Sequence, residues 1–332
     1  MTMRNKQWLL ASRPEGAVQE SNFRLVEIDV PALKDGQLLI KVHYLSLDPY
    51  MRGRMDDTKS YAPPQPLNEV MIGGTVGEVV ESRNAKYQSG DMVVGMGGWQ
   101  QYYVSEGAGL MEVDTRHIPA SVYLGTVGMP GVTAWYGLTQ IGKPKACETV
   151  VVSAASGAVG SVVGQLAKIH GCRAVGVAGG KAKCDYVVNE LGFDACVDYK
   201  AASFVEDLKA ATPDGIDIDF ENVGGAVFDV VLARMNAFGR IAVCGLIAGY
   251  NNQDMALKNV RSILVNRLTV EGFIVSEHPE IWPQALKELG GYVAAGRLKY
   301  RESVAQGIES APSAFMGLLK GANFGKQVVK MV

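Results

Sequence analysis

The chain has 332 residues, of which 48% are hydrophobic and 20% are charged, and its formal net charge is −2. A chain of this length usually needs more than one hydrophobic core, so two domains are expected. The lack of a basic surplus argues against nucleic-acid binding. No apolar run approaches the roughly 20 residues of a membrane-spanning helix, and the opening MTMRNKQWLLASRPEG lacks the apolar region of a signal peptide. We therefore expect a cytoplasmic protein without a membrane partner.

The first part of the chain is rich in strand and turn patterns. Its apolar residues alternate with polar ones or form short runs between Pro and Gly breakers, as strands do. The glycines inside these runs suit bulges and the corners of a barrel. The expected strands lie at residues 23–30, 36–47, 71–82 and 89–105. We interpret residues 1–125 as a β-rich domain with a partly closed barrel, joined by residues 300–332, whose last segment is expected to be a strand.

From Thr149 onward, short apolar strands alternate with helical segments. Strands are expected at residues 149–154, 173–178, 195–199, 216–225, 240–247 and 268–275. Helices are expected at residues 161–170, 183–191, 203–211, 226–236 and 280–296. This alternation predicts a parallel, doubly wound sheet with right-handed crossovers. Residues 126–299 are therefore interpreted as one α/β domain.

The stretch VVVSAASGAVGSVVGQLAKIHG joins the first of these strands to its helix, with the spacing Ala154-x-x-Gly157-x-x-Gly160. Small residues here allow a sharp turn and let a pyrophosphate approach the N–H groups at the helix N-terminus. Such a spacing is also typical of tight strand–helix packing. The position between a clear strand and a clear helix is the context that dinucleotide binding requires. The turn therefore predicts a dinucleotide site.

The end of the second strand indicates which dinucleotide binds. An NAD site usually has Asp or Glu there, about 20 residues after the glycine turn. This chain has Gly179 and Gly180 at that position, followed by Lys181 and Lys183, with Arg173 close in sequence. Lysines at the start of a helix are often only solvated. The missing acid and the added cations nevertheless favour the 2′-phosphate of NADPH.

The cysteines and histidines give no metal-binding pattern. None of the five cysteines forms a C-x-x-C pair, and none of the four histidines forms an H-x-x-x-H pair. We therefore expect reduced thiols and no bound metal.

The chain resembles the medium-chain dehydrogenase/reductase superfamily. Within it, the likeness is to the zinc-independent double-bond reductases, which include prostaglandin reductases and plant alkenal reductases, and it is closest to bacterial NADPH-dependent curcumin reductases. Zinc-dependent relatives carry a G-H-E segment and a four-cysteine lobe, whereas here MIGGTVGEV has no His and no cysteine precedes Cys147. The segments that carry the resemblance are LSLDPYMRGRM, GMPGVTAWYGL, AASGAVGSVVGQLAK, ENVGG, RIAVCGLIAGYN, GFIV and GLLKGANFGKQVVK. The resemblance implies a GroES-like catalytic domain, a Rossmann cofactor domain, a homodimer and catalysis without zinc.

The resemblance also implies the reaction and its residues. The reaction is NADPH-dependent reduction of the C=C bond of an α,β-unsaturated ketone or aldehyde, with a hydrogen bond to the carbonyl oxygen from Tyr250 or, as a second candidate, Tyr50. Packing of Tyr250 on the cofactor ribose, with the proton supplied by a ribose hydroxyl or water, stays open. The implied substrate contacts are Tyr50, Met51, Tyr61 and Tyr250. The implied cofactor contacts are Gly157, Ala158, Val159, Gly160, Lys183, Tyr199, Asn222, Cys244, Gly245, Leu246, Ile247, Tyr250, Phe273, Ile274, Val275 and Asn323.

Several alternatives remain open from the sequence. A quinone oxidoreductase of the same superfamily, or a non-catalytic NADPH-binding sensor, would share most of these motifs. Trp99, Tyr102 and Tyr103 form either an aromatic wall of the substrate site or part of a core. The segment NNQDMALKNVRSILVNRL differs from the proline-rich loop that usually follows this tyrosine in the family, so the choice of enone is left open.

Overall fold

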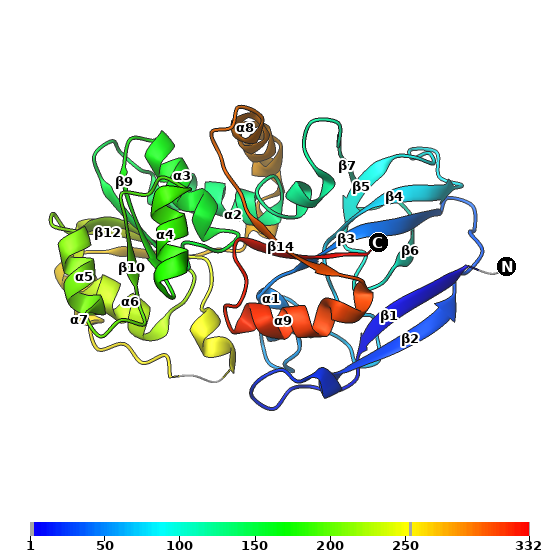
Figure 1. The fold of residues 1–332 in the computed structure, drawn as a ribbon, viewed down its shortest axis with the longest axis horizontal. Helices are drawn as coiled ribbons and strands as arrows, with labels where there is room; N and C mark the ends of the chain where they lie inside the picture. Colours follow the sequence, from blue (N-terminus) through cyan, green and yellow to red (C-terminus); the bar gives the residue numbers. More distant parts are fainter. Residues whose placement is uncertain (1–2, 252–253, 332) are drawn as a thin grey trace. The chain divides into compact units, whose positions relative to one another are not determined.

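The computed structural model describes residues 3–251 and 254–331 and divides the chain into two compact units. Unit 1 comprises Met1–Leu124 and Glu302–Val332, and unit 2 comprises Gly125–Arg301 (Figure 1). Unit 1 is rich in strands and unit 2 is a doubly wound α/β unit, which confirms the predicted fold class. Across the described ranges, no helix has both the length and the apolar character needed to cross a membrane.

Unit 1 is built on a seven-stranded sheet. Its strands are β3 (Leu38–Leu47), β4 (Thr75–Ser82), β5 (Met92–Gly95), β6 (Tyr102–Ser105), β7 (Met111–Glu112), β14 (Glu302–Gln306) and β15 (Lys326–Lys330). The order is β14-β15-β3-β4-β5-β7, with β6 paired to β3. The expected C-terminal strand is β15, and it pairs antiparallel with β3. Figure 1 shows these last strands, in orange to red, beside the blue strand β3.

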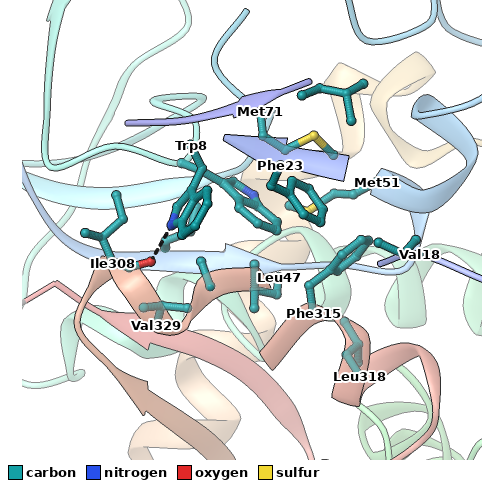
Figure 2. Close-up of a cluster of buried hydrophobic side chains, with 14 of the residues drawn as sticks. Trp8, Val18, Phe23, Leu47, Met51, Met71, Ile308, Phe315, Leu318 and Val329 are labelled. Carbon is teal, nitrogen blue, oxygen red and sulfur yellow. Dashed lines mark hydrogen bonds between the residues drawn. The ribbon is translucent and has the colours of Figure 1, made fainter. Parts of the chain in front are cut away.

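A hairpin and several short helices complete unit 1. They are β1 (Arg4–Leu10), β2 (Phe23–Asp29), α1 (Tyr50–Arg54), α9 (Ala311–Leu319) and the 3-10 turns η1 (Glu20–Asn22), η2 (Ala120–Leu124) and η7 (Ile308–Ser310). Figure 2 shows the core where the hairpin meets α9 and the sheet. Trp99 stacks on Phe23 with ring centroids 5.2 Å apart, and Phe315 meets Trp99 edge-on at 5.6 Å. The indole N–H of Trp8 donates to the carbonyl of Ile308 at 2.8 Å. The chain termini are thus tied together by one core.

Unit 2 contains a parallel six-stranded sheet with the order of a Rossmann fold. Its strands are β8 (Thr149–Ser153), β9 (Arg173–Ala178), β10 (Ala195–Asp198), β11 (Ile216–Glu221), β12 (Met235–Val243) and β13 (Thr269–Gly272). They lie in the order β10-β9-β8-β11-β12-β13. The helices are α2 (Met129–Tyr136), α3 (Gly160–Ile169), α4 (Lys181–Asn189), α5 (Phe204–Ala211), α6 (Gly225–Leu232), α7 (Arg261–Val265) and α8 (Trp282–Ala294). Further short turns are the π-helical η3 (Gly137–Gly142) and the 3-10 turns η4 (Ile247–Asn251), η5 (Val275–Glu277) and η6 (Pro279–Ile281).

The boundaries of unit 2 differ from expectation mainly around β12. The helix expected to end at residue 236 ends at Leu232, because Met235 is already a buried residue of β12. The strand expected to run to residue 247 ends at Val243, although the apolar sequence continues. Backbone hydrogen bonds from residues 244–248 to residues 221–223 draw that segment away from the strand direction. The sequence analysis also missed α1, α2, α7, α9, β1, β7 and β14.

Candidate functional site

The glycine turn after β8 leaves no space for a side chain at its last position. Ala154 has a left-handed φ of +50°, and its carbonyl oxygen lies 2.4 Å from the place of a Cβ on Gly160. Helix α3 begins at Gly160, and the first N–H groups of a helix lack intrahelical partners and carry its positive dipole end. The turn at Gly157, Ala158, Val159 and Gly160 therefore fits a pyrophosphate group.

The carboxyl edge of the sheet gathers the other segments proposed to bind the cofactor. The strand order reverses between β8 and β11, and such sheets bind ligands outside the carboxyl ends of the strands at that point. Asn222 follows β11, residues 244–250 follow β12, and residues 273–275 follow β13. The structure thus brings these three segments and the glycine turn to one edge of unit 2.

Two lysines converge at the carboxyl end of β9. A Cβ on Gly179 would lie 2.9 Å from the ring of Tyr199 and 3.0 Å from the side chain of Lys200, so both residues pack over this end. Asp198 fixes the loop by accepting the N–H groups of Gly180 at 2.8 Å and Lys200 at 3.0 Å. Burial, and then the charge of Lys200, lower the pKa of Lys183. Lys200, which the sequence analysis missed, adds a second cation where an anion is to be bound.

Of the other two cations expected near the 2′-phosphate, Arg173 lies at the opposite end of β9, and Lys181, at the start of α4, is paired with an acid. Arg173 is the first residue of β9 and therefore lies at the amino end of the strand, and its guanidinium donates to the carbonyl of Ala211 at 3.0 and 3.1 Å. The expectation for Arg173 is wrong: the six residues from Arg173 to Ala178 form the whole of β9, so Arg173 and Gly179 lie at opposite ends of the strand. Lys181 forms an exposed ion pair with Asp185 at 2.6 Å, one turn along α4.

Tyr250 lies in the turn η4, close to the end of β12. Its hydroxyl oxygen is 3.7 Å from the place of a Cβ on Gly245, an ordinary van der Waals distance, so the tyrosine side chain lies against the segment that directly follows β12. Burial, and then Glu221, raise the pKa of the Cys244 thiol to about 12, so this thiol stays protonated. Phe273 packs on Tyr136 with ring centroids 5.4 Å apart, and Val275 is buried. The aromatic ring of Phe273 therefore stabilises the helical layer.

The segment after Tyr250 is only partly described. Residues 252 and 253 of the unusual NNQD segment lie outside the described residues. Farther along, Asp229 of α6 accepts the N–H groups of Lys258 and Asn259 at 2.7 Å each. The later part of this loop is therefore fixed to the helix that begins beside Asn222.

In unit 1, Tyr50 begins α1 and follows Asp48, which forms a buried ion pair, by two residues. Asp48 and Lys326 are 5% and 4% exposed, and the Lys326 Nζ lies 2.5 Å from an oxygen of Asp48. Lys326 also donates to the carbonyl of Leu47 at 2.8 Å, and Ser46 donates its hydroxyl to Asp48. Asp48 is therefore more than a turn residue. Burial, and then Asp48 and Tyr61, raise the pKa of Tyr50, which keeps its hydroxyl protonated as a donor.

The remaining residues proposed for unit 1 differ in accessibility. Tyr61 is 56% exposed and near Tyr50, which suits a substrate contact. Met51 and Trp99 are fully buried in the core, so neither offers a surface to a substrate (Figure 2 labels Met51). Tyr103 packs on the same core. The side-chain amide of Asn323 donates to the carbonyl of Gly325 at 2.8 Å and shapes the turn before β15.

Comparison with known proteins places the chain in a family. Residues 6–113 match the family described as the N-terminal domain of oxidoreductase, and residues 158–290 match the family described as zinc-binding dehydrogenase. The NADPH-dependent curcumin reductase of Escherichia coli is 48% identical, covering 99% of this chain and 97% of that protein. The chain belongs to the medium-chain dehydrogenase/reductase family. Prostaglandin reductase 1 of Rattus norvegicus is 42% identical, covering 98% of each chain.

A solved structure within this family gives the same picture. The crystal structure of CurA in complex with NADPH, from Vibrio vulnificus, has a TM-score of 0.94 and 45% sequence identity, covering 98% of this chain and 99% of that one. One of the two family descriptions mentions zinc. In the part of this medium-chain dehydrogenase/reductase that the structure describes, no three His, Cys, Asp or Glu side chains are grouped so that they could hold a metal ion. Catalysis without zinc therefore stays a prediction for this chain.

Proposed function

We propose that this chain is an NADPH-dependent reductase of the C=C bond of α,β-unsaturated ketones and aldehydes. The observation that supports the cofactor is the pair Lys183 and Lys200 at the carboxyl end of β9, where an NAD enzyme would carry an acid. The likeness to a curcumin reductase over 99% of the chain supports the reaction. The glycine turn would hold the pyrophosphate, and Asn222 with residues 244–250 and 273–275 would hold the nicotinamide half.

When bound, NADPH supplies a hydride from the nicotinamide C4 to the β-carbon of the substrate. Negative charge then develops on the substrate carbonyl oxygen. The Tyr250 hydroxyl donates a hydrogen bond to this oxygen, and such a donor typically stabilises the transition state by about 3 kcal/mol. Tyr50 is the second candidate donor, since its raised pKa keeps its proton in place. The proton for the α-carbon comes from Tyr250, a ribose hydroxyl or water.

One assay separates this proposal from its alternatives. The purified protein is mixed with NADPH and an extended enone, with NADPH and a flat quinone, or with NADPH alone. Consumption of NADPH with the enone and a saturated ketone as product supports the proposal. Turnover with the quinone alone indicates a quinone oxidoreductase. Tight NADPH binding without turnover of either compound indicates a sensor.

We also propose that the chain forms a homodimer through the edge of its parallel sheet, and that it acts in the cytoplasm. All four residues of the edge strand β13 are exposed, and Leu264 in the nearby α7 is 79% exposed. Strand edges present unpaired N–H and C=O groups that a second copy can satisfy. Analytical ultracentrifugation should give twice the mass of one chain. Leu264→Glu should lower that mass, whereas Met96→Glu, the same apolar-to-charged change at a 62% exposed residue of unit 1, should not.

A further inference from the structure

One buried carboxylate lies at the point where the strand order of the parallel sheet reverses. Ser153 is the last residue of β8 and Glu221 is the last residue of β11, and these two strands are neighbours. Both side chains are completely buried. They therefore lie beneath the edge at which the cofactor is proposed to bind, without being exposed there.

Glu221 holds the loop that follows β11. One of its oxygens accepts hydrogen bonds from the Ser153 hydroxyl at 2.7 Å, the Val223 N–H at 2.5 Å and the Gly224 N–H at 2.8 Å. The Ser153 hydroxyl in turn accepts the N–H of Asn222 at 2.7 Å, and the Asn222 amide donates to the Ser153 carbonyl at 2.8 Å. Residues 222–224 are thus fixed by two side chains from two strands.

The same loop carries the segment that leads to Tyr250. The carbonyl of Glu221 accepts the N–H groups of Cys244 at 2.9 Å and Gly245 at 3.2 Å. The carbonyl of Asn222 accepts the N–H of Ile247 at 3.2 Å, and that of Val223 accepts the N–H of Ala248 at 3.0 Å. A shift of residues 222–224 would therefore move residues 244–248 as well.

Asp219 explains how Glu221 keeps its charge in this buried place. The two residues are separated by one position on β11, so both side chains point to the same face of the sheet. Neither oxygen of Asp219 has a hydrogen-bond partner within the described ranges. Three donors converge on one oxygen of Glu221, and its second oxygen is buried without a partner among the described residues. Burial, and then Glu221, raise the pKa of Asp219 far above its usual range. Burial raises the pKa of Glu221 as well, but hydrogen bonds from Gly224, Ser153 and Val223 act against this rise. These donors favour the proton on Asp219 and the negative charge on Glu221.

We propose that Glu221 is a positioning residue for the nicotinamide half of the cofactor site. Its ionised carboxylate preforms residues 222–224 and, through them, residues 244–248. The adenosine half is proposed to bind at Lys183 and Lys200, which follow β9 and β10, and none of the hydrogen bonds of Glu221 and Ser153 reaches that part of the site. This inference rests on the proposed cofactor site, and its test separates the two halves of that site.

The experiment compares binding of NADPH with binding of 2′,5′-ADP, which lacks the nicotinamide half. Glu221→Gln keeps the shape of the side chain and removes its charge. It should raise the Kd for NADPH roughly tenfold, because hydrogen bonds to a charged acceptor are stronger than neutral ones. The Kd for 2′,5′-ADP should stay unchanged. The fluorescence of bound NADPH, which reports the surroundings of the nicotinamide, should move toward that of free NADPH.

Two further variants complete the test. Asp219→Asn is the matched control, equally buried on the same strand face, and it should leave both Kd values unchanged because the residue is already neutral. Ser153→Ala removes one donor to Glu221 and the acceptor of the Asn222 N–H, and it should act in the same direction as Glu221→Gln. Equal weakening of both ligands by Glu221→Gln and Ser153→Ala, or no weakening of NADPH by either, would overturn the inference. Failure of the unaltered protein to bind NADPH would instead refute the proposed function.

Discussion

The two tyrosines proposed to act on the substrate are supported in different ways. Tyr50 begins a short helix that rests on a buried ion pair between Asp48 and Lys326, which join β3 to the C-terminal strand β15. Tyr250 lies on a 3-10 turn, and backbone hydrogen bonds to residues 221–223 hold the segment before it. The segment before Tyr50 is therefore fixed by a buried ion pair, and the segment before Tyr250 is fixed by backbone hydrogen bonds within a loop.

This difference suggests a division of roles. A buried ion pair is costly to disturb, and this one includes Asp48, two residues before Tyr50. The turn η4 places the hydroxyl of Tyr250 beside Gly245, at the carboxyl edge of unit 2 where the cofactor is proposed to bind. We therefore expect changes beneath Tyr50 to affect stability first, and changes at Tyr250 to affect the rate first.

The largest expected effect comes from removing the cation beneath Tyr50. Lys326→Met leaves the charge of Asp48 buried without its partner, which typically costs about 3–5 kcal/mol of the free energy of unfolding. Urea unfolding, followed by intrinsic tryptophan fluorescence, measures the change. Tyr50, a proposed donor to the substrate, lies two residues after Asp48. Its position should therefore change in this variant, and kcat should fall as well.

An exposed ion pair of the same type provides the control. Lys6 and Glu309 lie 2.5 Å apart, with side chains 40% and 54% exposed. Lys6→Met should cost less than about 1 kcal/mol, since water screens exposed pairs. The double variant Asp48→Asn/Lys326→Met should recover part of the lost stability. Equal losses at Lys326 and Lys6 would show that the buried pair does not give Tyr50 any special support.

The next largest effect is expected from Tyr250→Phe, which tests whether the Tyr250 hydroxyl acts on the rate. The variant keeps the ring and removes only the donor, so folding and NADPH affinity should change little. We expect kcat and kcat/KM to fall together by roughly 10- to 1000-fold, as for the loss of a donor used mainly in the transition state. Steady-state kinetics with a saturating enone gives both values.

Combining this variant with Tyr50→Phe shows whether both hydroxyls can donate a hydrogen bond to the substrate oxygen. If Tyr50 partly substitutes for Tyr250, the double variant should lose more than the product of the two single losses. If Tyr250→Phe keeps full kcat and only the KM for NADPH rises, Tyr250 packs against the cofactor. The hydrogen bond would then have to come from Tyr50, a ribose hydroxyl or water.

A smaller effect is expected at the adenosine end, which concerns neither tyrosine. Lys183→Ala and Lys200→Ala should each raise the KM for NADPH about tenfold, the size of one charged hydrogen bond, and leave NADH kinetics almost unchanged. Lys181→Ala, which removes a lysine paired with Asp185 on the same helix, serves as the control. Similar KM values for NADPH and NADH in the unaltered protein would contradict the proposed cofactor preference.

The sequence predicted unit 2 better than unit 1, for a physical reason. In unit 2, strands and helices follow one another along the chain, and each shows its own periodicity. In unit 1, β14 and α9 come from the far end of the chain and complete a sheet and core begun before residue 100, and of this end only the last strand, β15, was predicted from its sequence. Tertiary contacts of this kind, such as Phe315 on Trp99, leave no local pattern to read.

The site residues show the same limit. The glycine turn and the lysine after β9 could be read from spacing, because both depend on neighbours in sequence. Lys200 and Glu221 could not, since their importance depends on which strands lie side by side. Met51 was proposed as a substrate contact through its motif, but a helix turns successive side chains to different faces, and this one points into the core.

The roles proposed for Tyr50 and Tyr250 require that their hydroxyl groups, and no metal ion, stabilise the negative charge on the substrate oxygen. Zinc needs thiolates or other donors in a group of three or four. Burial raises the pKa of Cys172 to about 11 and that of Cys244 to about 12, so both thiols are protonated at neutral pH. The hydrogen-bonded thiols Cys184 and Cys196 make a pair, and no third ligand joins them among the described side chains. Chelation with EDTA or phenanthroline should therefore leave kcat unchanged, and elemental analysis should find no stoichiometric zinc. If the protein holds tightly bound zinc, and if removing it abolishes turnover and adding it back restores turnover, then the metal and not the tyrosines stabilises the charge on the substrate oxygen.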